Sequence, residues 1–125
     1  MPNTTSIMGL HLHYRLWIAE MNLDINVLRI FDDYLNELAA KRNEPEVESG
    51  IENFRKRFTF LRTEIDELKH EMHMIKMNLA AASRDGAADK DADRHSKLEQ
   101  QYTSFRQTFN ILKKEFGEFE ATWLV

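Results

Sequence analysis

Four ionisable side chains interrupt the apolar stripes of this sequence, and their types are those that bind metal ions. Glu20 and Asp24 are four residues apart, which is one turn of a helix. Glu67 and His70 have Glu-x-x-His spacing, which places both side chains on the same face of a helix. A charge buried among apolar residues is costly unless it is paired or coordinates a metal. These residues therefore predict either a metal site or a set of ion pairs.

The segment Glu67-Leu68-Lys69-His70 resembles the motif of ferritin-like di-iron carboxylate bundles. In that family two helices each supply a glutamate and two others each supply a Glu-x-x-His. This chain has one such motif, with Glu20 as the single glutamate, and it has three predicted helices where the family has four. A symmetric dimer would supply the full set. The resemblance implies a dimeric di-iron or di-manganese protein with a storage or oxidase role, in which Asp24 is an extra ligand or accepts the His70 N–H.

The alternative interpretation is purely structural. Glu20 and Asp24 would then pair with a basic residue such as Arg106, while Glu67 and His70 stay partly exposed or bond across a helix interface. The sequence has no cysteine, so thiolate ligands and cysteine nucleophiles are excluded. It also has no nucleophile elbow, phosphate-binding glycine loop or HExxH pair. We therefore expect no catalysis and no cofactor, with iron or manganese binding as the alternative.

Three long helices are predicted to carry these residues. Helix-forming residues fill the chain except in two segments, 43–50 and 83–91. The first helix is expected at about 6–42. The second is expected to begin at Pro45, or at a capping box formed by Ser49 and Glu52, and to end near 82. A flexible loop at 83–92 would precede the third helix at about 93–123, which has a possible capping box at Ser96 and Glu99.

Apolar residues recur in these helices at alternating steps of three and four, which is typical of coiled-coil packing. The seam of the second helix runs Ile51, Phe54, Phe58, Leu61, Ile65, Leu68, Met72, Ile75, Leu79, and that of the third runs Leu98, Tyr102, Phe105, Phe109, Leu112, Phe116, Phe119, Trp123. Helices this long can bury their faces only lengthwise. The sequence thus predicts a single all-α domain over 1–125, an antiparallel bundle of three long helices with coiled-coil-like packing.

A short connection after Arg42 also predicts the register of the first two helices. Glu20 should lie level with Met72, and Asp24 with Leu68. Basic residues repeat every seven positions beside the second seam, and we expect them to form ion pairs with acidic neighbours such as Asp32 and Glu115: they are Arg55, Arg62, Lys69 and Lys76. Gly117 is expected to mark a close approach between helices.

The charge balance argues against a nucleic-acid partner. Seventeen Lys and Arg stand against 21 Asp and Glu, and a net charge of −4 offers few phosphate contacts. No stretch approaches the roughly 20 apolar residues of a membrane-spanning helix. The first residues lack the basic and apolar regions of a secretory signal. A cytoplasmic location is the default expectation, because the chain has no cysteines that would indicate its redox environment.

The first two helices are apolar on more than one side, which predicts a second contact surface. Large apolar patches on a monomer are uncommon and mark interfaces. The predicted interface residues are Leu16, Leu23, Val27, Ile30, Phe60, Met74 and Met77. A homodimer or higher homo-oligomer is the simplest occupant, and an amphipathic helix of another protein, a wider bundle or a folded-back N-terminal segment are alternatives. The predicted function is a non-catalytic, self-associating scaffold or interaction module.

Overall fold

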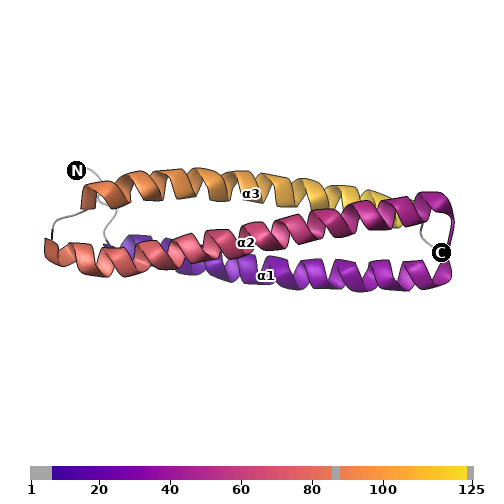
Figure 1. The fold of residues 1–125 in the computed structure, drawn as a ribbon, viewed down its shortest axis with the longest axis horizontal. Helices are drawn as coiled ribbons and strands as arrows, with labels where there is room; N and C mark the ends of the chain where they lie inside the picture. Colours follow the sequence, from indigo (N-terminus) through magenta and orange to yellow (C-terminus); the bar gives the residue numbers. More distant parts are fainter. Residues whose placement is uncertain (1–6, 86–87, 124–125) are drawn as a thin grey trace.

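The chain folds into three long helices and is all-α, as the computed structural model shows (Figure 1). The structure describes the backbone of residues 7–85 and 88–123, and the side chains of residues 9–78 and 93–123. Helix α1 spans Ile7–Lys41, α2 spans Pro45–Asp85 and α3 spans Ala88–Thr122. The helices run lengthwise in an up-down-up arrangement (Figure 1). The predicted three-helix antiparallel bundle is confirmed.

The start of α2 settles one of the two alternatives for this helix. The Glu44 carbonyl accepts hydrogen bonds from the N–H groups of Val47 and Glu48, both at 3.0 Å. Glu44 is therefore the cap, and Pro45 occupies the first helical position, where its missing N–H costs nothing. Ser49 is exposed inside the helix, so the capping box expected at Ser49 and Glu52 is wrong.

The second connection is shorter than predicted. The expected loop at 83–92 is wrong at 83–85 and 88–92, because these residues are helical. The flexibility predicted for this loop is not tested at 86–87, because these two residues lie outside the described backbone. The capping box expected at Ser96 and Glu99 is also wrong, because α3 begins at Ala88. The physical reason lies in helix propensity: alanines on both sides of Gly86 favour helix strongly, and this glycine is the only strong breaker in the segment.

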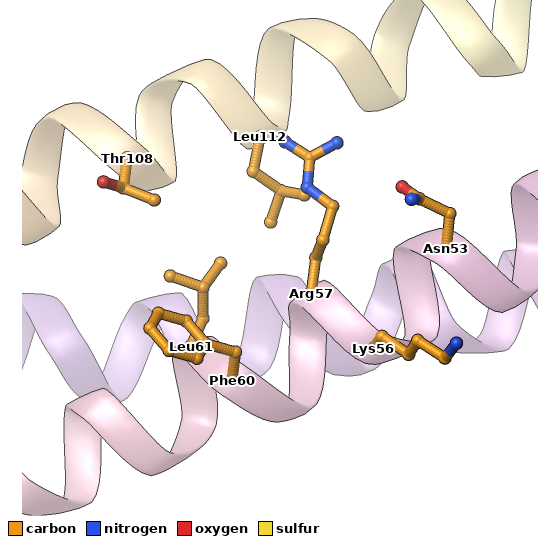
Figure 2. Close-up of a pocket in the computed structure, with 7 residues that line it drawn as sticks. All are labelled: Asn53, Lys56, Arg57, Phe60, Leu61, Thr108 and Leu112. Atoms are coloured by element: carbon orange, nitrogen blue, oxygen red, sulfur yellow. The ribbon is translucent and has the colours of Figure 1, made fainter.

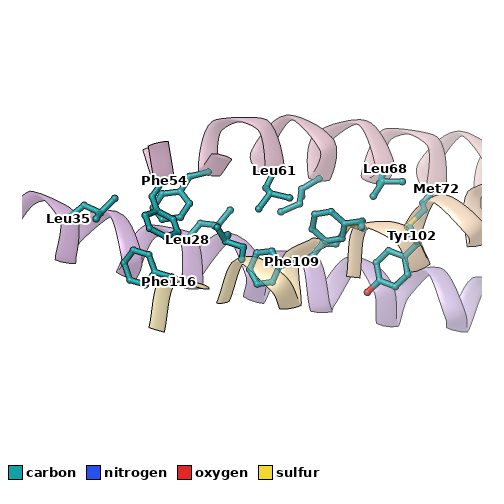
Figure 3. Close-up of a cluster of buried hydrophobic side chains, with 14 of the residues drawn as sticks. Leu28, Leu35, Phe54, Leu61, Leu68, Met72, Tyr102, Phe109 and Phe116 are labelled. Atoms are coloured by element: carbon teal, nitrogen blue, oxygen red, sulfur yellow. The ribbon is translucent and has the colours of Figure 1, made fainter. Parts of the chain in front are cut away.

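The core follows the predicted seams of α2 and α3, together with one apolar stripe of α1 (Figure 3). On α1 the buried seam includes Tyr14, Met21, Leu28 and Leu35, all with 0% exposure. The seams of α2 and α3 are buried from Ile51 to Ile75 and from Leu98 to Phe116, and Phe119 and Trp123 are partly buried against them. Leu79 lies outside the described side chains. Heptad spacing therefore accounts for which face of each helix forms the core.

Large side chains hold α1 and α3 together across a wide gap. No Cα atoms of the described residues in these two helices lie within 8 Å of each other, whereas α2 approaches both closely. Trp17 stacks on Tyr102 with 4.9 Å between ring centroids, and Phe31 stacks on Phe116 at 4.1 Å. Both pairs lie in the same order along α1 and α3, so these two helices are parallel. Aromatic rings thus replace close backbone contact here.

Polar contacts confirm the predicted register of α1 and α2. Lys69 donates a hydrogen bond to Asn22 Oδ1 at 2.7 Å, within one residue of the expected pairing. Arg55 and Arg62 lie 3.9 and 3.6 Å from the carboxylate of Asp32. Most of these side chains are more than one-third exposed, so the pairs contribute little stability and mainly set which surfaces face each other.

The two described glycines inside α2 and α3 have opposite surroundings. A Cβ at Gly117 would meet nothing within 4 Å, so the close helix approach expected there is wrong. A Cβ at Gly50 would overlap the ring of Phe119, so the close contact lies at Gly50 instead.

Replacing Gly117 with alanine is expected to raise the free energy of unfolding by about 0.5–1 kcal/mol, because alanine restricts the unfolded chain and fits the helix. Gly50→Ala should gain less or lose stability, because the added methyl group displaces Phe119. Urea unfolding of both variants measures the difference. Equal gains would contradict the close contact at Gly50.

Candidate functional site

A polar cluster lies between α1 and α3. Asp24 is only 3% exposed and accepts hydrogen bonds from both terminal nitrogens of Arg106. Arg106 also forms an ion pair with Glu20, at 3.8 Å, and Glu20 accepts a hydrogen bond from the Tyr102 hydroxyl. The pairing of Glu20 and Asp24 with Arg106, predicted as the structural alternative to a metal site, is confirmed.

Burial dominates the electrostatics of this cluster. Burial raises the pKa of Asp24 above its ordinary value, and the hydrogen bond and positive charge of Arg106 offset part of that shift. Burial also raises the pKa of the Tyr102 hydroxyl, and its hydrogen bond to Glu20 adds to the shift. Arg106 thus stabilises the ionised form of a carboxylate that would otherwise be costly to bury. The arrangement fits a structural ion pair.

The structure places the Glu-x-x-His pair elsewhere. Glu67 and His70 are both exposed on α2. Glu67 borders a hollow beside Glu64, Leu68, Glu71 and, from α3, Gln101. Among the side chains that the structure describes, no three His, Asp or Glu residues are grouped so that they could hold a metal ion. One chain therefore does not bring Glu20, Asp24, Glu67 and His70 together, because the first two face Arg106. A site shared between two chains stays a prediction.

The predicted interface residues are exposed, with one exception. Leu16, Leu23 and Ile30 on α1 have exposed fractions of 58, 61 and 61%. On α2 the exposed fractions are 62% for Phe60, 37% for Met74 and 67% for Met77. Val27 is different, because it is partly buried against the core, and the prediction for it is wrong to that extent.

Further exposed apolar side chains were not in the predicted interface. Leu12 on α1 and Ile111 on α3 are each 54% exposed. The spacing of Leu12 to Leu16, four residues, is the signal that places it in the same stripe. No comparable repeat identifies Ile111, which stands alone on its helix among the described residues.

A shallow groove between α2 and α3 begins beside Phe60 (Figure 2). Its volume is about 230 Å³, and it is lined by Leu61 and Leu112 at the base with Asn53, Lys56, Arg57, Phe60 and Thr108 around them. Arg57 forms an ion pair with Glu115 at 2.7 Å. Ligand pockets usually measure roughly 300–1,000 Å³, so this groove is small for a substrate. Of these residues only Phe60 was in the predicted interface, and Leu61 and Leu112 were predicted as core; the groove itself was not predicted, because it depends on how two helices pack.

Comparisons with protein-family models, curated proteins and solved structures found no match to this chain. Among the described residues, no helix is both long and apolar enough to cross a membrane.

Proposed function

We propose that this chain is a non-catalytic helical module that associates with a second copy of itself and serves as a scaffold or interaction module. The contact surface is the outer seam of α1, formed by Leu12, Leu16, Ala19, Leu23 and Ile30. The observation that carries the proposal is an apolar stripe left exposed on a helix that already packs its inward face against the bundle core.

The outer seam has no role in the bundle core. The residues of α1 that build the core are buried at 0–4% exposure, whereas the four large residues of the outer seam are 54–61% exposed. Together with Ala19 and Asn26, these residues follow alternating steps of four and three. All six positions therefore lie on one stripe of the helix. Leaving such a stripe in water forgoes about 25 cal/mol for each Å² of apolar surface that a partner would cover.

The second exposed stripe, on α2, is less suited to association. Phe60 is separated from Met74 and Met77 by three polar residues at the intervening stripe positions, Thr63, Glu67 and His70, and all three are exposed. Covering this stripe would remove a carboxylate and an imidazole from water, which costs free energy. The α1 stripe contains a single polar residue, Asn26, between Leu23 and Ile30.

A second copy is the simplest occupant, because a two-fold axis lets one surface cover itself. A helix of another protein would have to carry its own apolar stripe complementary to the outer seam. The expected assembly has twice the chain mass of 14.8 kDa, measured by light scattering during size-exclusion chromatography at micromolar concentrations.

Replacing Leu23 with glutamate is expected to weaken this dimer by at least about 100-fold, because two carboxylates would be buried at once, one from each copy. Ile111→Glu is the matched control, because Ile111 is equally apolar and 54% exposed but lies on α3. Sedimentation equilibrium gives both dissociation constants, and circular dichroism checks that the helices persist. A monomeric wild type, or a dimer broken by Phe60→Glu but not by Leu23→Glu, would overturn the proposal.

A further inference from the structure

We infer that the two copies align their α1 helices in parallel and in register, so that each residue of the outer seam meets its own counterpart. This inference rests on the proposed self-association and specifies its geometry. Two features of α1 carry it: the lone Asn26 within the outer seam, and the charges of Arg15 and Glu20 on its two edges.

Asn26 occupies an outer-seam position, three residues after Leu23 and four before Ile30, and it is exposed in the single chain. In a parallel, in-register pair it would face Asn26 of the partner subunit. An amide carries both donors and an acceptor, so two facing asparagines can bond to each other. A single asparagine in an apolar seam favours the register in which it meets its own copy, because other registers bury the amide without a partner.

The antiparallel alternative leaves Asn26 without a suitable partner. Aligning the two seams so that Leu12 faces Ile30 places Asn26 opposite Leu16. The buried amide of each copy would then lack a hydrogen bond, which disfavours this alignment. Shifting the register to avoid this contact would leave Ile30 uncovered.

The edge charges favour the same orientation. Arg15 lies just before Leu16, and Glu20 lies just after Ala19 on the other edge of the seam. In a parallel pair these two edges meet, so Arg15 would approach Glu20 of the partner subunit. Glu20 is 48% exposed at its side chain while it contacts Arg106, so it remains accessible to a second cation.

In an antiparallel pair each edge would instead meet its own copy. Arg15 would then approach Arg29 of the partner subunit, because both residues lie on the same edge of the outer seam and both are exposed. Like charges across an interface disfavour the wrong pairing.

A short outer seam is sufficient for dimerisation because α1 is already folded within the bundle. Leu12 to Ile30 spans about 27 Å at 1.5 Å per residue, which is only about three heptads. The residues of this seam are already helical within α1, which packs against α2 and α3, so association does not have to order them.

Cysteine cross-linking tests the orientation cleanly, because the chain has no cysteine of its own. Leu16→Cys and Ile30→Cys should each form disulfide-linked dimers under mild oxidation, because identical positions then lie within disulfide range, about 4.4–6.8 Å between Cα atoms. Met77→Cys on α2 is the control and should stay uncrosslinked, although Met77 is 67% exposed.

The contrary results are distinct from failure of the proposed function. If light scattering shows a dimer but cross-links form only in a mixture of Leu12→Cys and Ile30→Cys, the dimer is antiparallel. This result overturns the inference and leaves self-association intact. Wild-type monomer overturns both. Asn26→Leu provides a second readout: it should permit both cross-linking patterns, and an unchanged single pattern would show that Asn26 does not select the orientation.

Discussion

Phe116→Ala is expected to lower the free energy of unfolding by about 3–5 kcal/mol, because it removes a buried ring that touches all three helices. Phe116 is 4% exposed. Its ring stacks on Phe31 of α1 at 4.1 Å and meets Phe54 of α2 edge-on at 5.1 Å. The loss should be large for a core position. The backbones of α1 and α3 are not in close contact, so we expect them to fill little of the cavity that the missing ring leaves.

Urea unfolding monitored by circular dichroism at 222 nm measures this effect. Ile111→Ala, on the same helix but 54% exposed, is the matched control and should change stability by no more than about 0.5 kcal/mol. Phe116→Leu should fall between the two. Equal losses for Phe116→Ala and Ile111→Ala would contradict the position of Phe116 at the centre of the aromatic contacts.

Removing the cation of the buried cluster is expected to have the second large effect. Arg106→Leu should destabilise the bundle by about 3 kcal/mol, because it leaves the Asp24 carboxylate buried with no hydrogen-bond donor from Arg106. The double variant Asp24→Leu/Arg106→Leu should recover most of this loss, because an apolar pair can replace a buried ion pair. A double variant as unstable as the single one would show that shape, not charge, causes the loss.

The pH dependence of this defect has a definite sign. Burial already raises the pKa of Asp24 above its unfolded value, so ionising Asp24 costs folding free energy. Without Arg106 the pKa rises further. The deficit of Arg106→Leu relative to wild type should therefore be largest at neutral pH and shrink as the pH falls and Asp24 is protonated. Thermal unfolding of both proteins across this range checks it, and a deficit that grows at low pH would contradict the assignment.

Much of the fold was predictable from residue types and spacing. The three helices, their core seams and the pairing of α1 with α2 follow from heptad spacing and a short connection, which are local properties. Helix ends were less predictable. Ser49 and Ser96 both fit a capping box, yet each lies inside a helix, because a capping motif cannot stop a segment whose neighbours continue to pack or favour helix.

The candidate sites were predictable only in part. The sequence identified Arg106 as one possible partner for Asp24 but left a metal site as an alternative. Val27 and Leu23 both appeared to belong to an outer surface, yet Val27 packs against the core and Leu23 is 61% exposed. The rotation of α1 against α3 decides between such neighbours, and no local pattern specifies it.

The sequence by itself determined that three helices pack lengthwise. Apolar residues at heptad spacing define one apolar face on each helix, whichever helix that face packs against. Only the tertiary structure decided which charges meet and which apolar side chains remain in water. Those outcomes depend on how adjacent helices are rotated and spaced. Aromatic side chains join α1 to α3, Arg106 of α3 pairs with Asp24 of α1, and the outer seam of α1 stays exposed.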